Sequence, residues 1–379
     1  MSTCEGRCDM IPPPERIAYF VSPHGFGHAA RAAAVISVLQ EQRPSLHVDL
    51  FSHTPRWFFG SLLEGPIEYH ELFTDIGLVQ TSPLVEDLPA TVRQLDEFLP
   101  FDEHRIRQLV RQLLEEGCQL VVCDIAPLGI SVATRAGIPS VLIENFTWDW
   151  IYQGYPEYQT QLEKHIRYLA MIYAEATFRI QVEPNCQRQR ADLLTGPVSR
   201  KPGVPREQIK RRLKIPDQKK LILMTMGGIP DTCPFPDMLH VFEDCCFLVP
   251  GNNTRMEVHG NLIRLPYHSD FYHPDLVHAA DAVIGKVGYS TLAEVYHAGI
   301  PFGYITRSGF RESGILSAFV QEKMNGLPIT EDEYQNGSWA GRLRDLLALS
   351  TMPGTEKNGA DQVADFLVNL LESREGRLA

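Results

Sequence analysis

The sequence contains no uninterrupted apolar stretch of the roughly 18 to 20 residues that a membrane span needs. Its first fifteen residues, MSTCEGRCDMIPPPE, also lack the apolar centre of a secretion signal. Positive charge is scarce, since 35 Lys and Arg stand against 47 Asp and Glu, for a formal net charge of -12. A phosphate backbone is bound by concentrated Lys and Arg, so nucleic acid is disfavoured as a main partner. These absences predict a cytoplasmic protein without a transmembrane segment or a nucleic-acid partner, although a local basic site for one phosphate group is compatible with them.

Paired cysteine motifs are absent as well. The eight cysteines form no C-x-x-C pair, so the sequence signals neither a zinc knuckle nor a disulfide framework. Most of them are expected to be small buried hydrophobes. Cys4 and Cys8 fall within residues 1–15, a Pro-punctuated segment that we predict to be a flexible tail.

The length and the pattern of the remaining chain indicate two α/β units. A chain of 379 residues is too long for one ordinary hydrophobic core. Short β-rich apolar runs alternate with helical patterns, which is typical of parallel sheets covered by helices on both faces. Strands are predicted at 16–22, 46–52, 120–124, 140–145 and 178–183 and, after a break rich in Gly, Pro and basic residues, at 220–228, 246–251, 262–267, 281–286 and 301–306.

The break separates two similar series of strands. We predict an N-terminal Rossmann-like domain over 16–197, a linker over 198–217, a C-terminal Rossmann-like domain over 218–355 and a C-terminal helix over 356–379. Open α/β sheets bind ligands at the carboxyl ends of their strands. Both doubly wound domains are therefore expected to point their loops into one central cleft.

A Gly-rich turn carrying a histidine follows the first predicted strand. In SPHGFGHAARAAAVISVL, Gly25 and Gly27 permit a tight turn, and His28 falls at the start of an Ala-rich helix, in the predicted cleft. The alternative is a helix-start histidine held only by backbone hydrogen bonds. The partial match to G-x-G-x-x-G, with Ala30 in the third position, is weak evidence by itself.

Asp124 ends the apolar run LVVCD and should emerge at the same edge of the first sheet. A histidine that acts as a general base accepts a proton on one nitrogen while the other donates to an orienting carboxylate. Asp124 is a candidate for that carboxylate beside His28. Its alternative role is to cap the helix that begins near Pro127.

The next strand ends in ENFTWDWIY, which places amide, carboxylate and tryptophan side chains at a strand end. These groups suit stacking on, and hydrogen bonding to, a polyhydroxylated ring, whereas the alternative is an aromatic plug between the domains. The residues predicted to contact an acceptor are His24, Gly25 and Gly27 of the turn and Glu144, Asn145, Trp148 and Asp149 of this segment.

The second domain carries a candidate anion site in GKVGYSTLAEVYHAGIPF. Gly288 allows a turn, and Ser290 and Thr291 open a helix whose free backbone N–H groups favour a phosphate. Lys286 adds a point charge suited to a diphosphate. Glu294, one turn along, is placed to take both hydroxyls of a ribose; the alternative is a capping box formed with Thr291.

Two further loops of this domain supply candidate donor contacts. Gly227 and Gly228 in MTMGGIP let the backbone approach phosphate oxygens closely. Arg311 and Glu312 in RSGFRESGIL are placed to reach sugar hydroxyls, although exposed loop charges of this kind are equally ordinary.

With these motifs assembled, the chain resembles the GT-B glycosyltransferases, in particular the group of the lipid-linked peptidoglycan N-acetylglucosaminyltransferase and the plant natural-product glucosyltransferases. The resemblance of AADAVIGKVGYSTLAEVYHAGIPF to that group's donor signature implies that Glu294 binds ribose and that Gly288, Ser290 and Thr291 hold the diphosphate. Lys286 stands where the plant enzymes carry a phosphate-contacting His, and Tyr289 where their motif has Trp. The base-stacking Trp of the plant motif has no clear match, although Tyr267 lies near the expected place.

On the first-domain side, GFGHAAR resembles the loop that bears the family's catalytic base, which implies that role for His28 and the pairing role for Asp124. A closer resemblance, through HGFGHAAR, ENFTWDWIY and GKVGYSTLAEVYHAGIPF, is to the glycosyltransferase-like N-terminal half of plant L-arabinokinases. The Gly/Ser-rich ATP loop of their kinase half has no match in this sequence, so kinase activity is not expected.

These observations predict a GT-B enzyme that transfers a sugar from a nucleotide-diphosphate sugar, most simply a UDP-sugar, to an acceptor hydroxyl with inversion. No Asp-x-Asp ion clamp is evident, and neither a metal nor another obligatory cofactor is expected. The acceptor is a small molecule or a lipid-linked one; residues 53–63, HTPRWFFGSLL, are either an exposed apolar patch for a lipid or a buried amphipathic helix. Two alternatives stay open: a nucleotide-sugar 2-epimerase, which needs several carboxylates such as Asp124, Glu144 and Glu312, and a non-catalytic nucleotide-sugar-binding protein.

Overall fold

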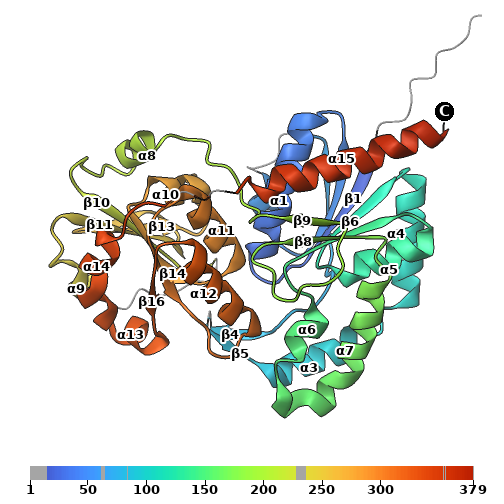
Figure 1. Ribbon diagram of the computed structural model, residues 1–379, viewed down its shortest axis with the longest axis horizontal. Coiled ribbons are helices and arrows are strands. Elements are labelled where there is room, and N and C mark those ends of the chain that lie inside the picture. Colours follow the sequence, from blue (N-terminus) through green and yellow to red (C-terminus); the bar gives the residue numbers. More distant parts are fainter. Residues whose placement is uncertain are drawn as a thin grey trace, which may run out of the picture.

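The computed structural model describes residues 15–60, 65–82, 84–227, 236–352, 354 and 356–378. It contains two seven-stranded α/β sheets side by side, each flanked by helices (Figure 1). The predicted tail before Glu15, with Cys4 and Cys8, and the predicted donor contact Gly228 lie outside the described residues. The predicted class, two Rossmann-like units, is confirmed.

The first sheet has the strand order β3-β2-β1-β6-β7-β8-β9, and every neighbouring pair in it is parallel. Its strands are β1 (Arg16–Val21), β2 (His47–Ser52), β3 (Ile67–Glu71), β6 (Leu120–Asp124), β7 (Ser140–Glu144), β8 (Phe178–Val182) and β9 (Leu193–Thr195). The helices of this half are α1 (Gly27–Gln42), α2 (Arg56–Gly60), α3 (Leu88–Phe98), α4 (Glu103–Glu115), α5 (Pro127–Ala136), α6 (Trp148–Tyr152), the 3-10 turn η1 (Pro156–Tyr158) and α7 (Gln159–Ala174).

The second sheet has the order β12-β13-β11-β10-β14-β15-β16, and only β12 and β13 pair in antiparallel fashion. Its strands are β10 (Lys220–Thr225), β11 (Cys245–Asn253), β12 (Glu257–His259), β13 (Leu262–Pro266), β14 (Ala282–Lys286), β15 (Phe302–Ile305) and β16 (Gly326–Ile329). The accompanying helices are α8 (Arg206–Arg212), α9 (Pro236–Leu239), α10 (His273–Ala279), α11 (Tyr289–Ala298), α12 (Arg311–Lys323), α13 (Glu331–Asn336), the 3-10 turn η2 (Ser338–Arg342) and α14 (Leu343–Ala348).

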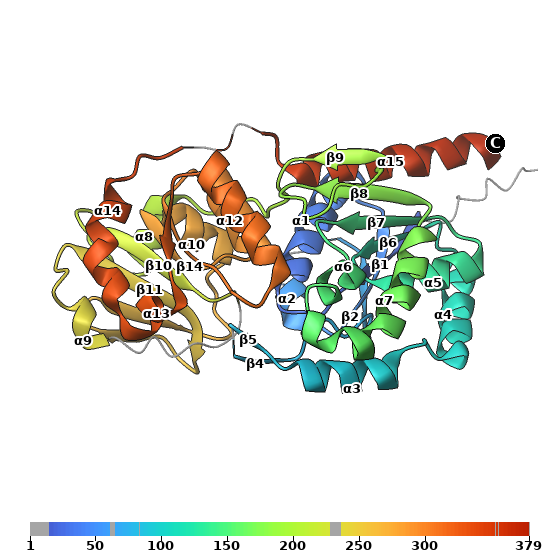
Figure 2. The same cartoon turned by 60° about the horizontal axis from the view of Figure 1, so that its bottom comes forward.

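A helix and a hairpin each reach from one half of the molecule to the other. The last helix, α15 (Gly359–Leu378), returns to the first half and lies along α1, where Val363, Ala364 and Leu367 join the core beneath that helix (Figure 1). The hairpin of β4 (Gln80–Ser82) and β5 (Val85–Glu86) reaches from the first half to the second (Figure 2), where Leu84 packs against the second core.

Helix α1 is the element through which the two halves pack most closely. Its sequence, GHAARAAAVISVLQEQ, is rich in alanine, and almost every position from His28 to Gln40 is buried. Small side chains let a helix approach its neighbours closely, because the distance between helix axes depends on the side chains at the contact. Accordingly, Tyr289 and Ala293 of α11 belong to the same hydrophobic core as α1. The two predicted motif-bearing helices therefore lie against each other.

Candidate active site

A small cavity of about 70 Å³ between the two halves brings the two predicted motifs together. His28 at the start of α1 and Gly288 at the start of α11 both line it. A Cβ atom built on Gly27 would lie only 3.8 Å from the hydroxyl oxygen of Ser290. The Gly-rich turn of the first half thus faces the helix start of the second across one gap.

His28 is paired with Asp124 as the sequence suggested. The distance from His28 Nδ1 to Asp124 Oδ1 is 2.9 Å, and the Asp124 side chain is completely buried. Strand β6 delivers the carboxylate beside the end of β1, since Val21 and Asp124 are partners in the sheet register. The capping alternative does not hold, because α5 has Ala126 as its N-cap residue and no side-chain cap.

Arg31, which the sequence interpretation did not single out, completes this pair. Its guanidinium donates from Nε to Asp124 Oδ2 over 2.8 Å and from Nη2 to Oδ1 over 2.6 Å. Burial alone would raise the pKa of Asp124, but the charge and hydrogen bonds of Arg31, together with His28, lower it below its usual value. An ionised carboxylate can only accept, so His28 carries its proton on Nδ1 and leaves Nε2 free to take another.

A chain of hydrogen bonds continues from Arg31 into the second half. Arg31 Nη1 donates to Asn145 Oδ1 over 2.7 Å, and Asn145 Nδ2 donates to Glu312 Oε1 over 2.7 Å. Glu312 stands on α12 and lines the small cavity, and its burial raises its pKa. His28 of the first half and Glu312 of the second are therefore connected through Asp124, Arg31 and Asn145.

The other residues predicted on the acceptor side are not all brought to the cavity. His24, Gly25 and Gly27 line it. Trp148 is fully buried, with its ring 5.0 Å from that of His24 in an edge-on contact, so it supports the histidines and cannot stack on a sugar. The structure thus favours the aromatic plug over the sugar platform.

Glu144 and Asp149 also depart from the prediction, since neither lines the small cavity. The Glu144 carboxylate accepts instead from Arg179 over 3.0 Å and from Gln181 over 2.9 Å. Strand alternation explains the position of Glu144, the last residue of β7, because its side chain points to the opposite face from that of Asn145.

The predicted anion site is assembled around the start of α11. Gly288 is the N-cap residue, and Ser290 and Thr291 follow in the first turn and line the gap. Gly227 lies opposite them, with Lys286 beside it. Burial and the nearby charge of Arg307 lower the pKa of Lys286 from 10.5 to about 7, so this ammonium group is poised to gain from a bound anion.

Arg307 is a second basic side chain that the sequence interpretation missed. It is buried, lines the small cavity, pairs with Glu86 of the β4–β5 hairpin over 3.3 Å and lies 3.7 Å above the ring of Phe310. Arg311, in contrast, lines neither cavity. It donates to the Trp150 carbonyl over 2.6 Å with its guanidinium over that tryptophan ring, so its predicted position at the sugar is wrong in this structure.

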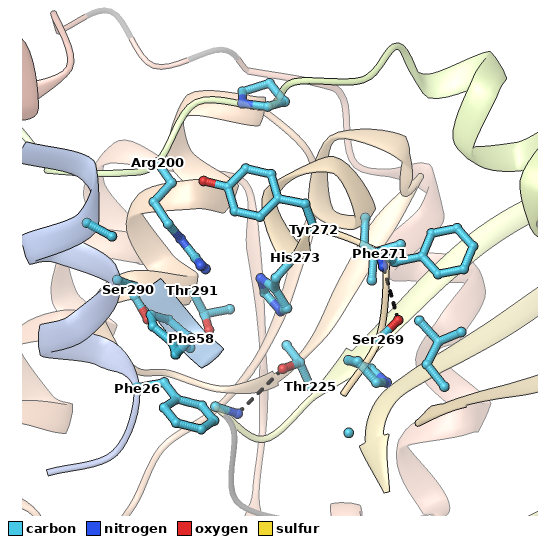
Figure 3. A pocket seen from close by; sticks show the side chains of 18 of the residues that line it. Phe26, Phe58, Arg200, Thr225, Ser269, Phe271, Tyr272, His273, Ser290 and Thr291 are labelled. Atoms are coloured by element: carbon cyan, nitrogen blue, oxygen red, sulfur yellow. Dashed lines mark hydrogen bonds between the residues drawn. The ribbon is translucent and has the colours of Figure 1, made fainter. Parts of the chain in front are cut away.

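Glu294 is held by two basic side chains rather than by its own helix start. Arg200, from the segment between the halves, donates from Nε and Nη2 to Oε1 over 3.0 and 2.8 Å, and His273 contacts Oε2 at 2.8 Å. The capping-box alternative with Thr291 is excluded, because Gly288 is the N-cap. Figure 3 shows Arg200 pointing down toward Thr291 beside His273. These partners line the adjacent cavity, whereas Glu294 lies behind them.

That adjacent cavity, here called the large cavity, measures about 740 Å³ and shares Phe26, Gly227, Ser290 and Thr291 with the small one. Aromatic rings from both halves surround it; those relevant here are Phe26, Trp57 and Phe58 from the first half and Tyr267 and His268 from the second. The described part of segment 53–63 therefore places Trp57 and Phe58 in this cavity rather than on an outer patch.

Some acidic, histidine and cysteine side chains among the described residues lie close enough together to hold a metal ion. Two clusters have suitable spacing, Asp49 with Glu116 and Cys118, and Asp49 with Glu68 and His70. Arg16 already donates to both oxygens of Asp49, over 2.9 and 3.1 Å. None of these residues lines the small or the large cavity, so they do not bear on the chemistry there.

The facing α/β units, with a histidine turn at the end of β1 and a Gly-Tyr-Ser-Thr helix start after β14, have the architecture of a glycosyltransferase of the GT-B class. Comparison with known proteins gives the family. The profile described as glycosyl transferase family 1 matches residues 15–336, and the chain belongs to this family.

A curated relative and solved structures are similar to this chain. L-arabinokinase of Arabidopsis thaliana is 27% identical over 355 residues, which cover 92% of this chain and 34% of that protein, so this chain spans about a third of the relative's length. MurG of Acinetobacter baumannii superposes with a TM-score of 0.55 at 16% identity over 94% of this chain and 100% of MurG. A UDP-glucosyltransferase from Polygonum tinctorium gives 0.57 at 14% identity over 94% and 93%. The two superpositions establish the shared fold. No helix in the described part of the chain has the length and apolarity to cross a membrane.

Proposed function

We propose that this glycosyltransferase moves a sugar from a nucleotide-diphosphate sugar, with UDP-sugars the first candidates, to an acceptor hydroxyl. One observation carries the proposal: the His28–Asp124 pair of the first half and the α11 helix start of the second line the same small cavity. A proton acceptor and an anion site are thereby set on opposite sides of the place where a sugar would lie.

In the proposed reaction, His28 Nε2 removes the proton of the acceptor hydroxyl as its oxygen attacks the anomeric carbon. Asp124, kept ionised by Arg31, stabilises the imidazolium that forms. Attack comes from the face opposite the diphosphate, so the configuration is inverted. We propose that the acceptor enters from the side of His24, beside the Gly25–Gly27 turn that lines the small cavity.

The leaving diphosphate gains negative charge as the glycosidic bond breaks. Backbone N–H groups at the start of α11, the hydroxyls of Ser290 and Thr291, the ammonium of Lys286 and the amide of Gly227 would meet that charge. With these groups in place we propose transfer that does not depend on a metal. Gly228, assigned the same role, lies outside the described residues.

The ribose contact requires a rearrangement around Glu294. A carboxylate offers about four acceptor positions, and Arg200 and His273 use three of those of Glu294. One position is left, so both ribose hydroxyls can be accommodated only if Arg200 or His273 withdraws. We propose that the donor displaces Arg200 from Glu294 and that Tyr289, Tyr267 and Glu312 complete the donor surroundings.

The epimerase alternative has less support. Of its three candidate carboxylates, only Glu312 lines either cavity among the described residues, while Asp124 is enclosed behind His28 and Glu144 binds Arg179. A donor incubated without an acceptor is therefore expected to yield no epimer by NMR.

The test of the proposal is His28→Ala, assayed by nucleoside diphosphate release from a panel of nucleotide sugars with hydroxyl acceptors. We expect transfer to fall by roughly 100-fold or more, because general base catalysis contributes about that much, while nucleoside diphosphate binding stays intact. His53→Ala, an exposed histidine outside both cavities, is the matched control. Near wild-type transfer by His28→Ala would refute the assigned base.

A further inference from the structure

Five aromatic side chains form a cluster that spans the two halves at the large cavity. Phe26, Trp57 and Phe58 belong to the first half, Tyr267 and His268 to the second, and we call these five the interdomain aromatic cluster. Trp57 makes the shortest ring contacts across the gap, with ring centroids 4.4 Å from His268 and 5.3 Å from Tyr267, and Phe26 lies 6.3 Å from Tyr267. Phe26 stacks on Phe58, with ring centroids 4.8 Å apart, and both rings are labelled in Figure 3.

These rings are not a closed hydrophobic core. Tyr267 is 38% exposed, and all five side chains line the large cavity. Core aromatic residues of this protein, such as Trp148 and Trp339, are instead 0% and 1% exposed. Rings from opposite domains that remain accessible to solvent inside a cavity are available to a planar ligand.

The cavity is connected to the anion site. Ser290 and Thr291 at the start of α11 line both cavities, as do Gly227 and Phe26. In a nucleotide sugar, a diphosphate at that helix start carries the sugar at one end and the nucleoside at the other. The small cavity of about 70 Å³ has no room for the nucleoside. The large cavity, about 740 Å³, lies within the usual range of ligand pockets, roughly 300 to 1,000 Å³. The nucleoside end must therefore enter the large cavity, on the side of Glu294 and Arg200.

A nucleobase stacks on aromatic rings without a requirement for a particular base, because every base has a π-face. The second half supplies Tyr267 and His268 for this purpose, and both are smaller rings than tryptophan. Trp57 on α2 supplies the largest ring, and it contacts those two residues from the opposite side.

We propose that Trp57 of the first domain stacks on the base of the donor against Tyr267 and His268, so that the base site is shared between the two domains. The proposal rests on the proposed use of a nucleotide donor. Its consequence is that the base separates Trp57 from His268 and holds the two halves together at the moment when His28 faces the sugar. Trp57 acts here as a donor-positioning residue and takes no part in the chemistry.

The experiment compares uridine diphosphate with inorganic pyrophosphate, which has the phosphates and no base, by calorimetric titration of wild type, Trp57→Ala and Trp57→Phe. Loss of one base-stacking ring is expected to weaken uridine diphosphate binding by roughly 5- to 150-fold. Pyrophosphate binding should be unchanged, and Trp57→Phe should recover most of the affinity. Phe73→Ala is the matched control, since Phe73 is an exposed ring, 43% accessible, outside both cavities.

Fluorescence gives an independent readout. Uridine diphosphate should quench the emission of the wild type and quench Trp57→Phe much less. Equal affinity of Trp57→Ala and wild type for uridine diphosphate would overturn the proposal, and so would a parallel loss of pyrophosphate binding, which indicates a structural defect. If wild type binds pyrophosphate and no nucleoside diphosphate, the nucleotide donor itself is refuted, a result distinct from either of these.

Discussion

Arg31 is the side chain that joins His28, Asp124 and Asn145 into one unit. It lies three residues after His28 on α1, so the two side chains share a helix face. That spacing is visible in GFGHAAR, and the arginine could have been predicted from it. The roles of Arg200 and Trp57 could not have been predicted from the sequence. Arg200 contacts Glu294, which lies 94 positions away, and Trp57 contacts His268 of the opposite domain.

Replacing Arg31 by methionine tests the role of this unit. Asp124 would remain buried with only His28 opposite it, so its pKa should rise and the imidazole should lose its fixed orientation. We expect transfer to fall by roughly 100-fold, the acidic limb of the rate profile to move to higher pH, and the free energy of unfolding to fall by about 3 kcal/mol. Arg167→Met, at a side chain 73% exposed, is the control. An unmoved acidic limb would show that Arg31 does not act through Asp124.

Lys286 predicts a pH dependence of diphosphate binding. With a pKa of about 7 in the free protein, its ammonium is charged below that pH and neutral above it, so uridine diphosphate affinity should decline as the pH rises through about 7. Lys286→Arg should flatten this dependence, because a guanidinium stays charged. Titrations on either side of neutrality measure it; an affinity of wild type that is constant with pH would count against the contact.

The lowered pKa of Lys286 also makes protein stability depend on pH, but in the opposite direction from uridine diphosphate affinity. The folded pKa lies below the ordinary 10.5, so the unfolded chain binds more protons between about pH 7 and 10.5. The contribution of Lys286 to the free energy of unfolding therefore rises with pH across this window.

At the scale of helices and strands, the sequence predicted the central strands and missed the borders of the sheets. All ten predicted strands occur. The missed strands β3, β9, β12 and β16 are the four edge strands, and the remaining two form the short β4–β5 hairpin. An edge strand is covered on fewer sides, and β3 and β12 contain no fully buried residue, so they give no continuous apolar run. Only the buried central strands have the continuous apolar run from which strands were predicted.

Replacement by alanine should have opposite effects on stability at two helical glycines, Gly129 of α5 and Gly314 of α12. A Cβ atom added to Gly129 of α5 would lie 2.7 Å from Cys123 Sγ and from the Phe20 ring. A Cβ atom added to Gly314 of α12 would have no neighbouring atom within 4 Å. Gly129→Ala should lower the free energy of unfolding by about 1 to 3 kcal/mol, and Gly314→Ala should raise it by up to about 1 kcal/mol. Urea unfolding measures both; stabilisation by Gly129→Ala would contradict the packing.

At the scale of the whole molecule, the two halves form one site because the contacts between them converge on it. Asn145 and Glu312, Arg307 and Glu86, and Trp57 and His268 are each a pair across the domain boundary. The sequence predicted that the two motifs would meet in a cleft. Which side chains bridge it depends on how the domains are oriented, and no local pattern encodes that orientation.

In the proposed complex, one donor molecule occupies the gap between the two motifs. A crystal structure of the protein with uridine diphosphate tests this most directly. We predict that the diphosphate lies at the start of α11, in contact with Ser290, Thr291 and Lys286 and facing His28, with the base beside Trp57. Diphosphate bound on a surface away from both His28 and Gly288 would contradict the account.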